Sequence, residues 1–151
     1  MEYAIENEYL IVTVTTWGAQ VKSVVRKFDD VEHMWQADKS VWGYHAPILF
    51  PHTGKVVDDL IETKGEVYQA KQHGFARLME HTLVRQTEDT IVMELRSSEE
   101  TLRIFPYAFR MVSTFTLDGD TLHHKLTVEN WDADKLYFGI GYHPALSLIH
   151  I

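Results

Sequence analysis

The chain has 151 residues, of which 45% are hydrophobic and 24% charged, with a formal net charge of -8 and no cysteine. This composition suits one soluble globular domain and excludes collagen, disordered tails and coiled coils. The acidic balance argues against nucleic acid, whose phosphates require a basic surface. We expect no membrane span, because no apolar run approaches roughly 20 residues. The acidic N-terminus is unlike a signal peptide, and the lack of cysteine favours a reducing, cytoplasmic location.

Alternation of apolar and polar residues predicts most of the regular structure. In chain order, strands are predicted over residues 9–14, 21–26, 83–84, 91–95, 109–117, 121–128 and 136–140. Asp118-Gly119-Asp120 predicts a tight hairpin turn, because glycine tolerates positive φ and aspartate caps its own backbone.

Helical signals are few. Residues 97–102 predict one short helical turn with a serine N-cap, which Pro106 would soon end. The segment 42–72 contains several prolines and glycines and predicts a loop with short strands. Many short strands separated by turns indicate an all-β sandwich or barrel.

Several common catalytic signatures are missing from the sequence: a glycine-rich phosphate loop, a serine nucleophile elbow and a zinc-binding HExxH helix. A metal site is not expected, because the adjacent His123 and His124 would point to opposite faces of a strand. The nine histidines and the many aromatic residues suit the binding of a neutral sugar, although packing of a β-sandwich core accounts for most of the aromatic residues.

Two of three chemically distinctive segments lie in the loop-rich middle of the chain. The first, PILFPHTGK, ends in a glycine turn that presents Lys55; residue types alone slightly favour a rigid loop with a solvated lysine. The second, QHGFAR, places a glycine directly after His73, so that a ligand can approach the backbone closely. Arg77 follows four residues later and could share that site or pair with Glu80; the alternative is a turn with a surface histidine.

The third segment, GIGYHP over residues 139–144, delivers His143 immediately before a proline. The residue before proline is held in extended geometry, which limits the direction of the imidazole. A positioned group with a pKa near neutrality is what a general acid requires. The alternative is a histidine at a strand end on the rim of the sandwich.

Taken together and in this order, the three segments resemble the aldose 1-epimerase (galactose mutarotase) superfamily, most closely its LacX-like branch. That branch carries a Pro-x-Leu-Phe-Pro-x-x-Gly loop, then His-Gly-Phe-Ala-Arg, then Gly-x-His-Pro-Ala. Residues 33–36 with Trp42, residues 105–109 and residues 128–130 also match family patterns. The resemblance extends from about Ala4 to Ala145. It implies an antiparallel β-supersandwich that acts on a small-molecule aldohexose.

The resemblance also implies a mechanism and site residues. A histidine protonates the ring oxygen of the sugar while a glutamate removes the C1 hydroxyl proton, so that the ring opens and closes again as the other anomer. No metal or organic cofactor is needed, because a hemiacetal is already labile. By position, His143 matches the general acid and His73 the second histidine, which holds sugar oxygens. Lys55 falls near the sequence position at which mutarotases place a substrate-binding arginine, so here a lysine would take that place. Arg77 belongs to a motif shared with hexose-6-phosphate epimerases, in which it could favour phosphate; in this chain a structural ion pair is an equal alternative.

One departure from the family concerns the C-terminal end. The family's catalytic glutamate lies well downstream of the Gly-x-His-Pro motif, whereas this chain has eight residues after His143. We expect residues 1–145 to be the N-terminal portion of a mutarotase-like domain. Residues 146–151, LSLIHI, match the translation of a common library adaptor and are expected to be non-native.

Three functions therefore remain open at the sequence level. The leading hypothesis is a cytoplasmic mutarotase that is inactive as the 151-residue fragment. The alternatives are a hexose-6-phosphate epimerase, against which the acidic net charge argues mildly, and a sugar-binding module without catalysis. The sequence leaves the particular sugar and the oligomeric state undetermined.

Overall fold

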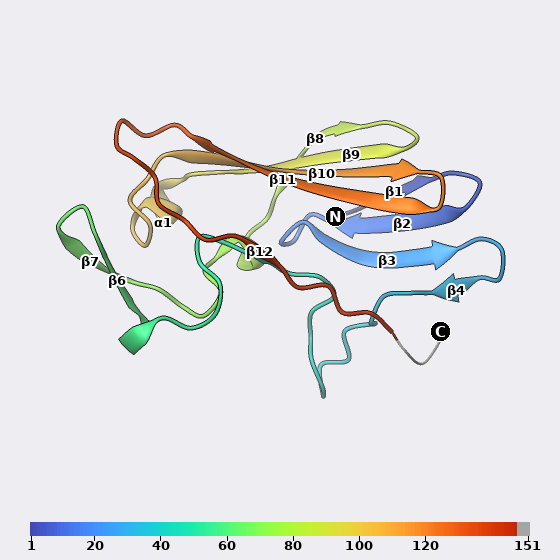
Figure 1. Ribbon diagram of the computed structural model, residues 1–151, viewed down its shortest axis with the longest axis horizontal. Helices are drawn as coiled ribbons and strands as arrows, with labels where there is room; N and C mark the ends of the chain where they lie inside the picture. The colour runs from blue at the N-terminus through green and yellow to red at the C-terminus, as the bar shows by residue number, and fades with distance from the viewer. Residues whose placement is uncertain (148–151) are drawn as a thin grey trace.

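Two four-stranded antiparallel sheets, one above the other, dominate the computed structural model, which describes residues 1–147 (Figure 1). The first sheet has the order β1-β2-β3-β4 and the second the order β11-β10-β9-β8. The first contains β1 (Glu2–Glu6), β2 (Leu10–Thr15), β3 (Gln20–Arg26) and β4 (Val31–Glu32). The second contains β8 (Thr82–Gln86), β9 (Thr90–Arg96), β10 (Phe109–Asp118) and β11 (Thr121–Asn130).

The smaller elements lie beside these sheets. Two two-stranded ladders pair β5 (Ile48–Leu49) with β12 (Gly141–Tyr142), and β6 (Leu60–Thr63) with β7 (Glu66–Gln69). The helical elements are the 3-10 turns η1 (Val57–Asp59) and η2 (Ala76–Leu78) and the α-helix α1 (Glu99–Leu102). None of the helices in residues 1–147 is long and apolar enough to cross a bilayer.

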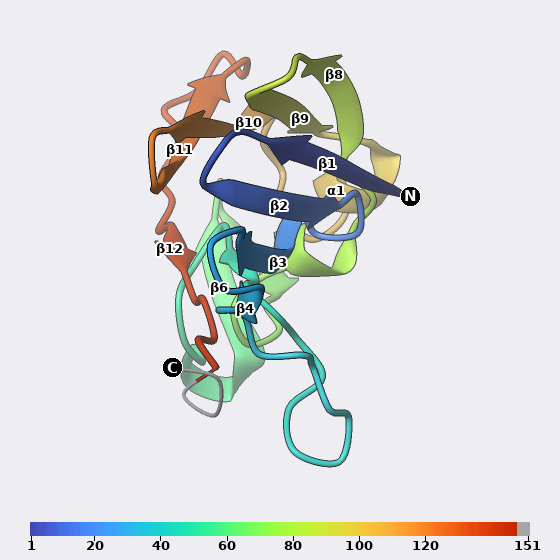
Figure 2. The same ribbon diagram turned by 90° about the vertical axis from the view of Figure 1, so that its right-hand side faces the viewer.

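The two sheets are stacked (Figure 2), and the core lies between them because apolar residues of both belong to one buried cluster. Burial alternates strictly along β2 and along nine residues of β10, as expected for strands with one covered face. Phe50, from the loop-rich middle of the chain, is fully buried and packs against four other aromatic rings, those of Phe75, Phe105, Phe109 and Phe138. The segment that carries the first motif is therefore anchored in the core.

Most of the predicted elements are confirmed. The strands expected over 9–14, 21–26, 83–84, 91–95, 109–117 and 121–128 correspond to β2, β3, β8, β9, β10 and β11, and the Asp118–Asp120 turn joins the last two. The short helix also forms, with Ser98 as its N-cap: the Ser98 Oγ accepts the Thr101 N–H at 3.3 Å, and Thr101 Oγ1 accepts the Ser98 N–H at 2.8 Å. Strand β1 was missing from the sequence prediction.

The strand predicted over residues 136–140 is wrong. In this segment Gly139 donates one backbone hydrogen bond to the Pro51 carbonyl at 2.7 Å, and the ladder begins only at β12. The physical reason lies in the partner strand. Pro47 and Pro51 bracket β5 and have no N–H to donate, so β5 can offer a ladder of only two residues.

The tail expected to be non-native falls largely outside the described residues. Of residues 146–151, only Leu146 and Ser147 are described; Leu146 bridges to Met34, and the Ser147 N–H donates to the His33 carbonyl at 2.8 Å. The remaining four residues, 148–151, lie outside the described part of the chain.

Candidate functional site

Strand β5 brings the three motifs together. On one side it pairs antiparallel with β12, so that Tyr142 lies opposite Ile48 and His143 follows at the end of the ladder. On the other side a parallel bridge joins Phe50 to Gly74, the residue after His73. Segments about 70 residues apart in sequence therefore meet at the ends of one short buried strand. This arrangement places both predicted histidines beside the same loop.

His73 is held by the glycine turn of the first motif. Its backbone N–H donates to the Gly54 carbonyl at 2.8 Å, and its ring Nδ1 accepts the Gly54 N–H at 2.9 Å. Because Nδ1 accepts, the neutral imidazole carries its proton on Nε2, where it can donate to a ligand oxygen. The Gln72 side-chain amide reaches within 3.3 Å of that Nε2, and an Nε2 proton pairs with it when the amide turns its oxygen to the ring. Gln72 was singled out by sequence only as the start of its motif.

Burial lowers the pKa of His73 below the usual histidine value, and charged neighbours add to the effect. These neighbours are Arg77, His143 and His52. The shift disfavours the charged ring, so Nδ1 stays unprotonated and can accept the Gly54 N–H. The contribution of Arg77 and His143 to this shift places both side chains near His73.

His143 is exposed and reaches the site from the end of β12. Its backbone N–H donates to the Pro47 carbonyl at 3.1 Å, which continues the pairing with β5 by one residue. Its imidazole packs against the indole of Trp42, with ring centroids 5.1 Å apart and planes inclined by 39°. The expected placement of this histidine at a strand end is therefore what the structure shows, and one aromatic neighbour contacts its ring.

Arg77 ends the second motif and lies in η2. Its guanidinium donates from Nη2 to the Gln72 carbonyl at 3.0 Å and lies over the Tyr44 ring at 4.9 Å from the centroid. The ion pair with Glu80 that the sequence allowed is absent: Glu80 instead accepts a hydrogen bond from Thr16. Within residues 1–147, Arg77 forms no salt bridge, and its Nε is buried without a hydrogen-bond partner.

Lys55 lies apart from these contacts. It follows Gly54, which adopts φ +77°, and its side chain is 66% exposed. The ammonium pairs with Asp59 at 3.6 Å, four residues further along. In the described part of the chain no contact joins Lys55 to either histidine or to Arg77, so its role in substrate binding stays a prediction.

Three glutamates of the described chain, Glu80, Glu94 and Glu129, are already paired with other groups. Glu94 and Glu129 both bond to Arg110, at 2.7 and 2.9 Å, and Glu80 contacts Thr16 and the N-terminal ammonium. No group of three metal-ligating side chains occurs among residues 1–147. His123 and His124 differ in burial as neighbours on a strand must, the first exposed and the second covered.

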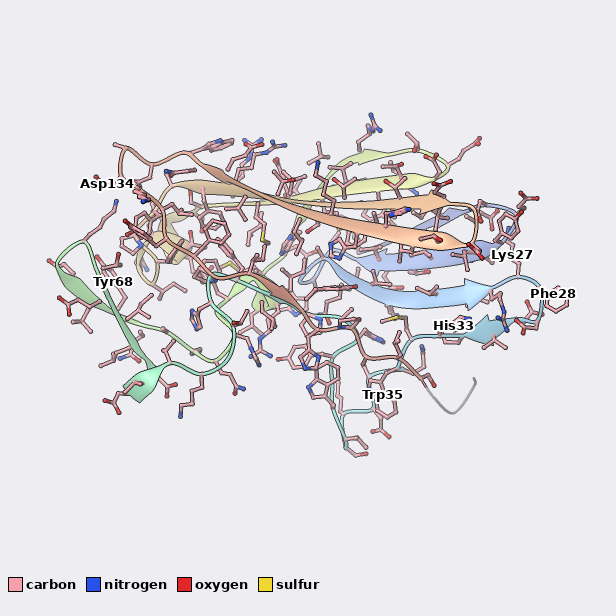
Figure 3. The ribbon with its side chains drawn as sticks, viewed as in Figure 1. Lys27, Phe28, His33, Trp35, Tyr68 and Asp134 are labelled. Carbon is pink, nitrogen blue, oxygen red and sulfur yellow. The ribbon has the colours of Figure 1, made fainter. Side chains whose placement is uncertain are left out.

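The sequence did not predict a place in the site for two residues, Trp42 and Tyr44. Trp42 was noted only as a family match, and Tyr44 only in the count of aromatic residues. Both lie in the loop of residues 35–45, which projects beyond β4 and in which Trp35 is labelled (Figure 3). The signal that could have found them is a pair of aromatic residues two apart, just before a buried motif.

The fold and these contacts define a class: an antiparallel β-sandwich protein with two histidines and an arginine beside one short strand. The comparisons agree. A family model described as aldose 1-epimerase matches residues 1–150, and the chain belongs to that family.

Individual relatives agree as well. Protein LacX of Lactococcus lactis subsp. lactis (the plasmid form) is 33% identical over 154 residues, which cover 97% of this chain and 51% of the relative. A galactose mutarotase related enzyme from Lactobacillus acidophilus superposes with a TM-score of 0.97 at 36% identity, covering 99% of this chain and 50% of that one. A galactose mutarotase-like protein from Lactobacillus casei gives a TM-score of 0.94 at 33% identity, covering 97% and 50%. The chain thus spans about half the length of the relatives it matches.

Proposed function

We propose that the protein to which this chain belongs is a sugar isomerase that interconverts the anomers of an aldohexose, with His143 and His73 in its active site. The observation that carries the proposal is the meeting of these two histidines at the ends of β5, each fixed by backbone hydrogen bonds to the loop between Pro47 and Gly54. Family membership supports the same reaction class.

In the proposed mechanism His143 is the general acid. Its protonated ring delivers a proton to the ring oxygen of the sugar as the bond from that oxygen to C1 breaks. A base removes the C1 hydroxyl proton, and the electron pair forms the aldehyde. Rotation about C1–C2 and reversal of these steps give the other anomer. Both proton transfers are of the kind that positioned side chains accelerate.

His73 acts as a neutral hydrogen-bond donor in this proposal. Its proton lies on Nε2 because Gly54 occupies Nδ1, and its lowered pKa keeps the ring uncharged. It would hold a sugar oxygen beside the reacting ring without competing for the proton that His143 transfers. The hemiacetal is labile enough that we propose no metal or organic cofactor.

We further propose that the base is a carboxylate outside these 151 residues. Glu80, Glu94 and Glu129 already serve other partners, and the chain spans half of its relatives. The reading frame past the codon for Ala145 tests this directly. A glutamate in the continuing sequence supports it, and native coding sequence that stops here overturns it. A continuing sequence with no suitable carboxylate would favour a sugar-binding module without catalysis.

The activity is tested by polarimetry of anomer exchange with the complete polypeptide. His143→Asn is expected to lower kcat by roughly 10²–10⁴-fold, the usual contribution of a general acid. His123→Asn is the matched control, because His123 is an exposed histidine on β11. An unchanged rate in His143→Asn would remove that residue from the mechanism.

A phosphorylated sugar is a second candidate substrate, and the surroundings of Arg77 favour it. A guanidinium without a carboxylate partner in residues 1–147, close enough to lower the pKa of His73, is suited to an anion. The test compares an aldohexose with its 6-phosphate. If phosphate is recognised, Arg77→Gln raises KM for the phosphorylated sugar by at least tenfold and leaves KM for the neutral sugar within twofold. Equal effects on both sugars would exclude this candidate.

We also propose a cytoplasmic location, based on the absence of cysteine in the 151 residues. Fractionation of cells that express the complete polypeptide tests it. Recovery in the cytoplasmic fraction is expected, and recovery with secreted or membrane material would overturn it.

A further inference from the structure

We propose that Trp42 is a positioning residue for His143 and that, through Tyr44, it fixes the spacing between His143 and Arg77. The three contacts form one continuous aromatic bridge from the end of β12 to η2. This inference rests on the proposed function, because it assigns a catalytic consequence to the orientation of His143. The contact itself is independent of any activity.

The bridge consists of neighbouring ring contacts. The Trp42 indole lies 5.1 Å from the His143 imidazole and 5.6 Å from the Tyr44 ring, centroid to centroid. The Arg77 guanidinium lies over the Tyr44 ring, 4.9 Å from its centroid. These separations are those of favourable aromatic pairs and of a cation over a ring. His143 and Arg77, which the sequence singled out, are thus connected through the rings of Trp42 and Tyr44.

The loop that carries the bridge is held by its own hydrogen bonds. The Trp35 indole N–H donates to the Trp42 carbonyl at 2.8 Å, and the Trp42 N–H donates to the Asp38 carbonyl at 2.7 Å. The His45 ring Nδ1 lies 2.7 Å from the Trp35 carbonyl. Each of these bonds closes the loop on itself, so the backbone at Trp42 is held by the loop's own contacts.

The same loop is also tied to the segment after His143. The Trp35 N–H donates to the Ala145 carbonyl at 2.9 Å, and the Ala145 N–H donates to the His45 carbonyl at 2.8 Å. Ala145 therefore lies between the two ends of the loop. The backbone is therefore held at His143 itself, through Pro47, and two residues later at Ala145, through the loop.

The imidazole of His143 nevertheless has few restraints of its own. Within the described residues its ring forms no hydrogen bond, and the side chain is exposed. The face of Trp42 is the contact that limits its rotation. A general acid must lie within hydrogen-bond reach of the atom it protonates, and a misplacement of about 1 Å can cost about 10²-fold in rate. Loss of the indole should therefore reduce kcat and leave sugar affinity largely unchanged.

The test uses Trp42→Leu and Trp42→Phe in the complete polypeptide. Leucine keeps apolar bulk without a ring, whereas phenylalanine keeps a ring face. Trp131→Ala is the control, because Trp131 is a tryptophan that also lies beside an arginine, Arg96 of the second sheet, and is outside the bridge. Polarimetry should show kcat lowered roughly 10- to 100-fold in Trp42→Leu, KM within twofold, and most of the rate restored in Trp42→Phe. The control should retain the wild-type rate.

Carbon–proton NMR of the histidine rings provides a second readout, with the His143 signal identified by its loss in His143→Asn. The Trp42 ring current should displace the His143 ring protons in the wild type, and Trp42→Leu should abolish that displacement while the signals of buried His81 stay in place. An unchanged His143 signal in Trp42→Leu overturns the contact. An altered signal with an unchanged kcat overturns the positioning role. If His143→Asn itself leaves the rate unchanged, the proposed function fails instead, and the NMR result still decides whether the bridge exists.

Discussion

Replacing Gly74 by alanine tests whether the Phe50–Gly74 bridge positions His73. Gly74 adopts φ +68°, and a Cβ added there would lie 2.5 Å from the Phe50 carbonyl carbon, 2.7 Å from Pro51 Cδ and closer still to the Phe50 oxygen. Carbon atoms pack at about 3.5–4.0 Å, so the two segments must separate by roughly 1 Å. Gly65 is the matched control: it adopts φ +77°, and nothing lies within 4 Å of its added Cβ.

The expected cost follows from the contacts that must give way. The left-handed conformation costs an alanine about 1 kcal/mol at either position. At Gly74 the separation also breaks two hydrogen bonds to the Phe50 carbonyl, from Phe75 at 2.9 Å and Ala76 at 3.3 Å, each worth about 1 kcal/mol. Gly74→Ala should therefore lower the free energy of unfolding by about 3 kcal/mol, and Gly65→Ala by about 1 kcal/mol.

Urea denaturation of the complete polypeptide, followed by tryptophan fluorescence, measures both values. The His73 ring signal in NMR should move in Gly74→Ala and stay in place in Gly65→Ala. Equal losses of stability in the two variants, with His73 unmoved, would refute the view that a close backbone approach sets this side of the site.

Three further outcomes are expected. Burial lowers the pKa of His124 from 6.5 to about 4. As the pH falls, the His124 ring is therefore protonated in the unfolded chain before it is protonated in the folded chain. The folded state should lose stability between pH 6.5 and 4, by no more than about 3 kcal/mol. His124→Phe, which keeps a ring against Phe115, should flatten that part of the stability curve, and an unaltered pH dependence would contradict the assignment. Ser98→Ala should cost about 1 kcal/mol in chemical denaturation, because it removes the N-cap of α1, and no loss would show that the cap contributes nothing. The 151-residue chain alone should be poorly soluble, because β11 is a ten-residue edge strand in the described sheet and Tyr137, Phe138 and Ile140 are exposed. It should also show no mutarotation. A cooperative thermal melt with measurable activity would contradict this prediction.

Much of the sandwich could be read from local pattern. Strands such as β2 and β10 alternate in sequence and alternate in burial, because neighbouring side chains on a strand must face opposite ways. The turn at Gly119 and the cap at Ser98 are equally local. The strand expected over residues 136–140 failed because a ladder needs a partner with N–H groups, and the prolines that limit β5 lie about 90 residues away.

The candidate site divides in the same way. The sequence by itself determined the fold class, the three motifs and their histidines, because these depend on residue type and short spacing. Tertiary structure alone decided that His73 and His143 both lie beside β5 and that Arg77 lies over Tyr44 rather than beside Glu80. It also decided that the Trp42 ring contacts His143. The reason is physical: contacts between residues about 30 to 100 positions apart are created by strand pairing and by packing around Phe50, which no local pattern encodes.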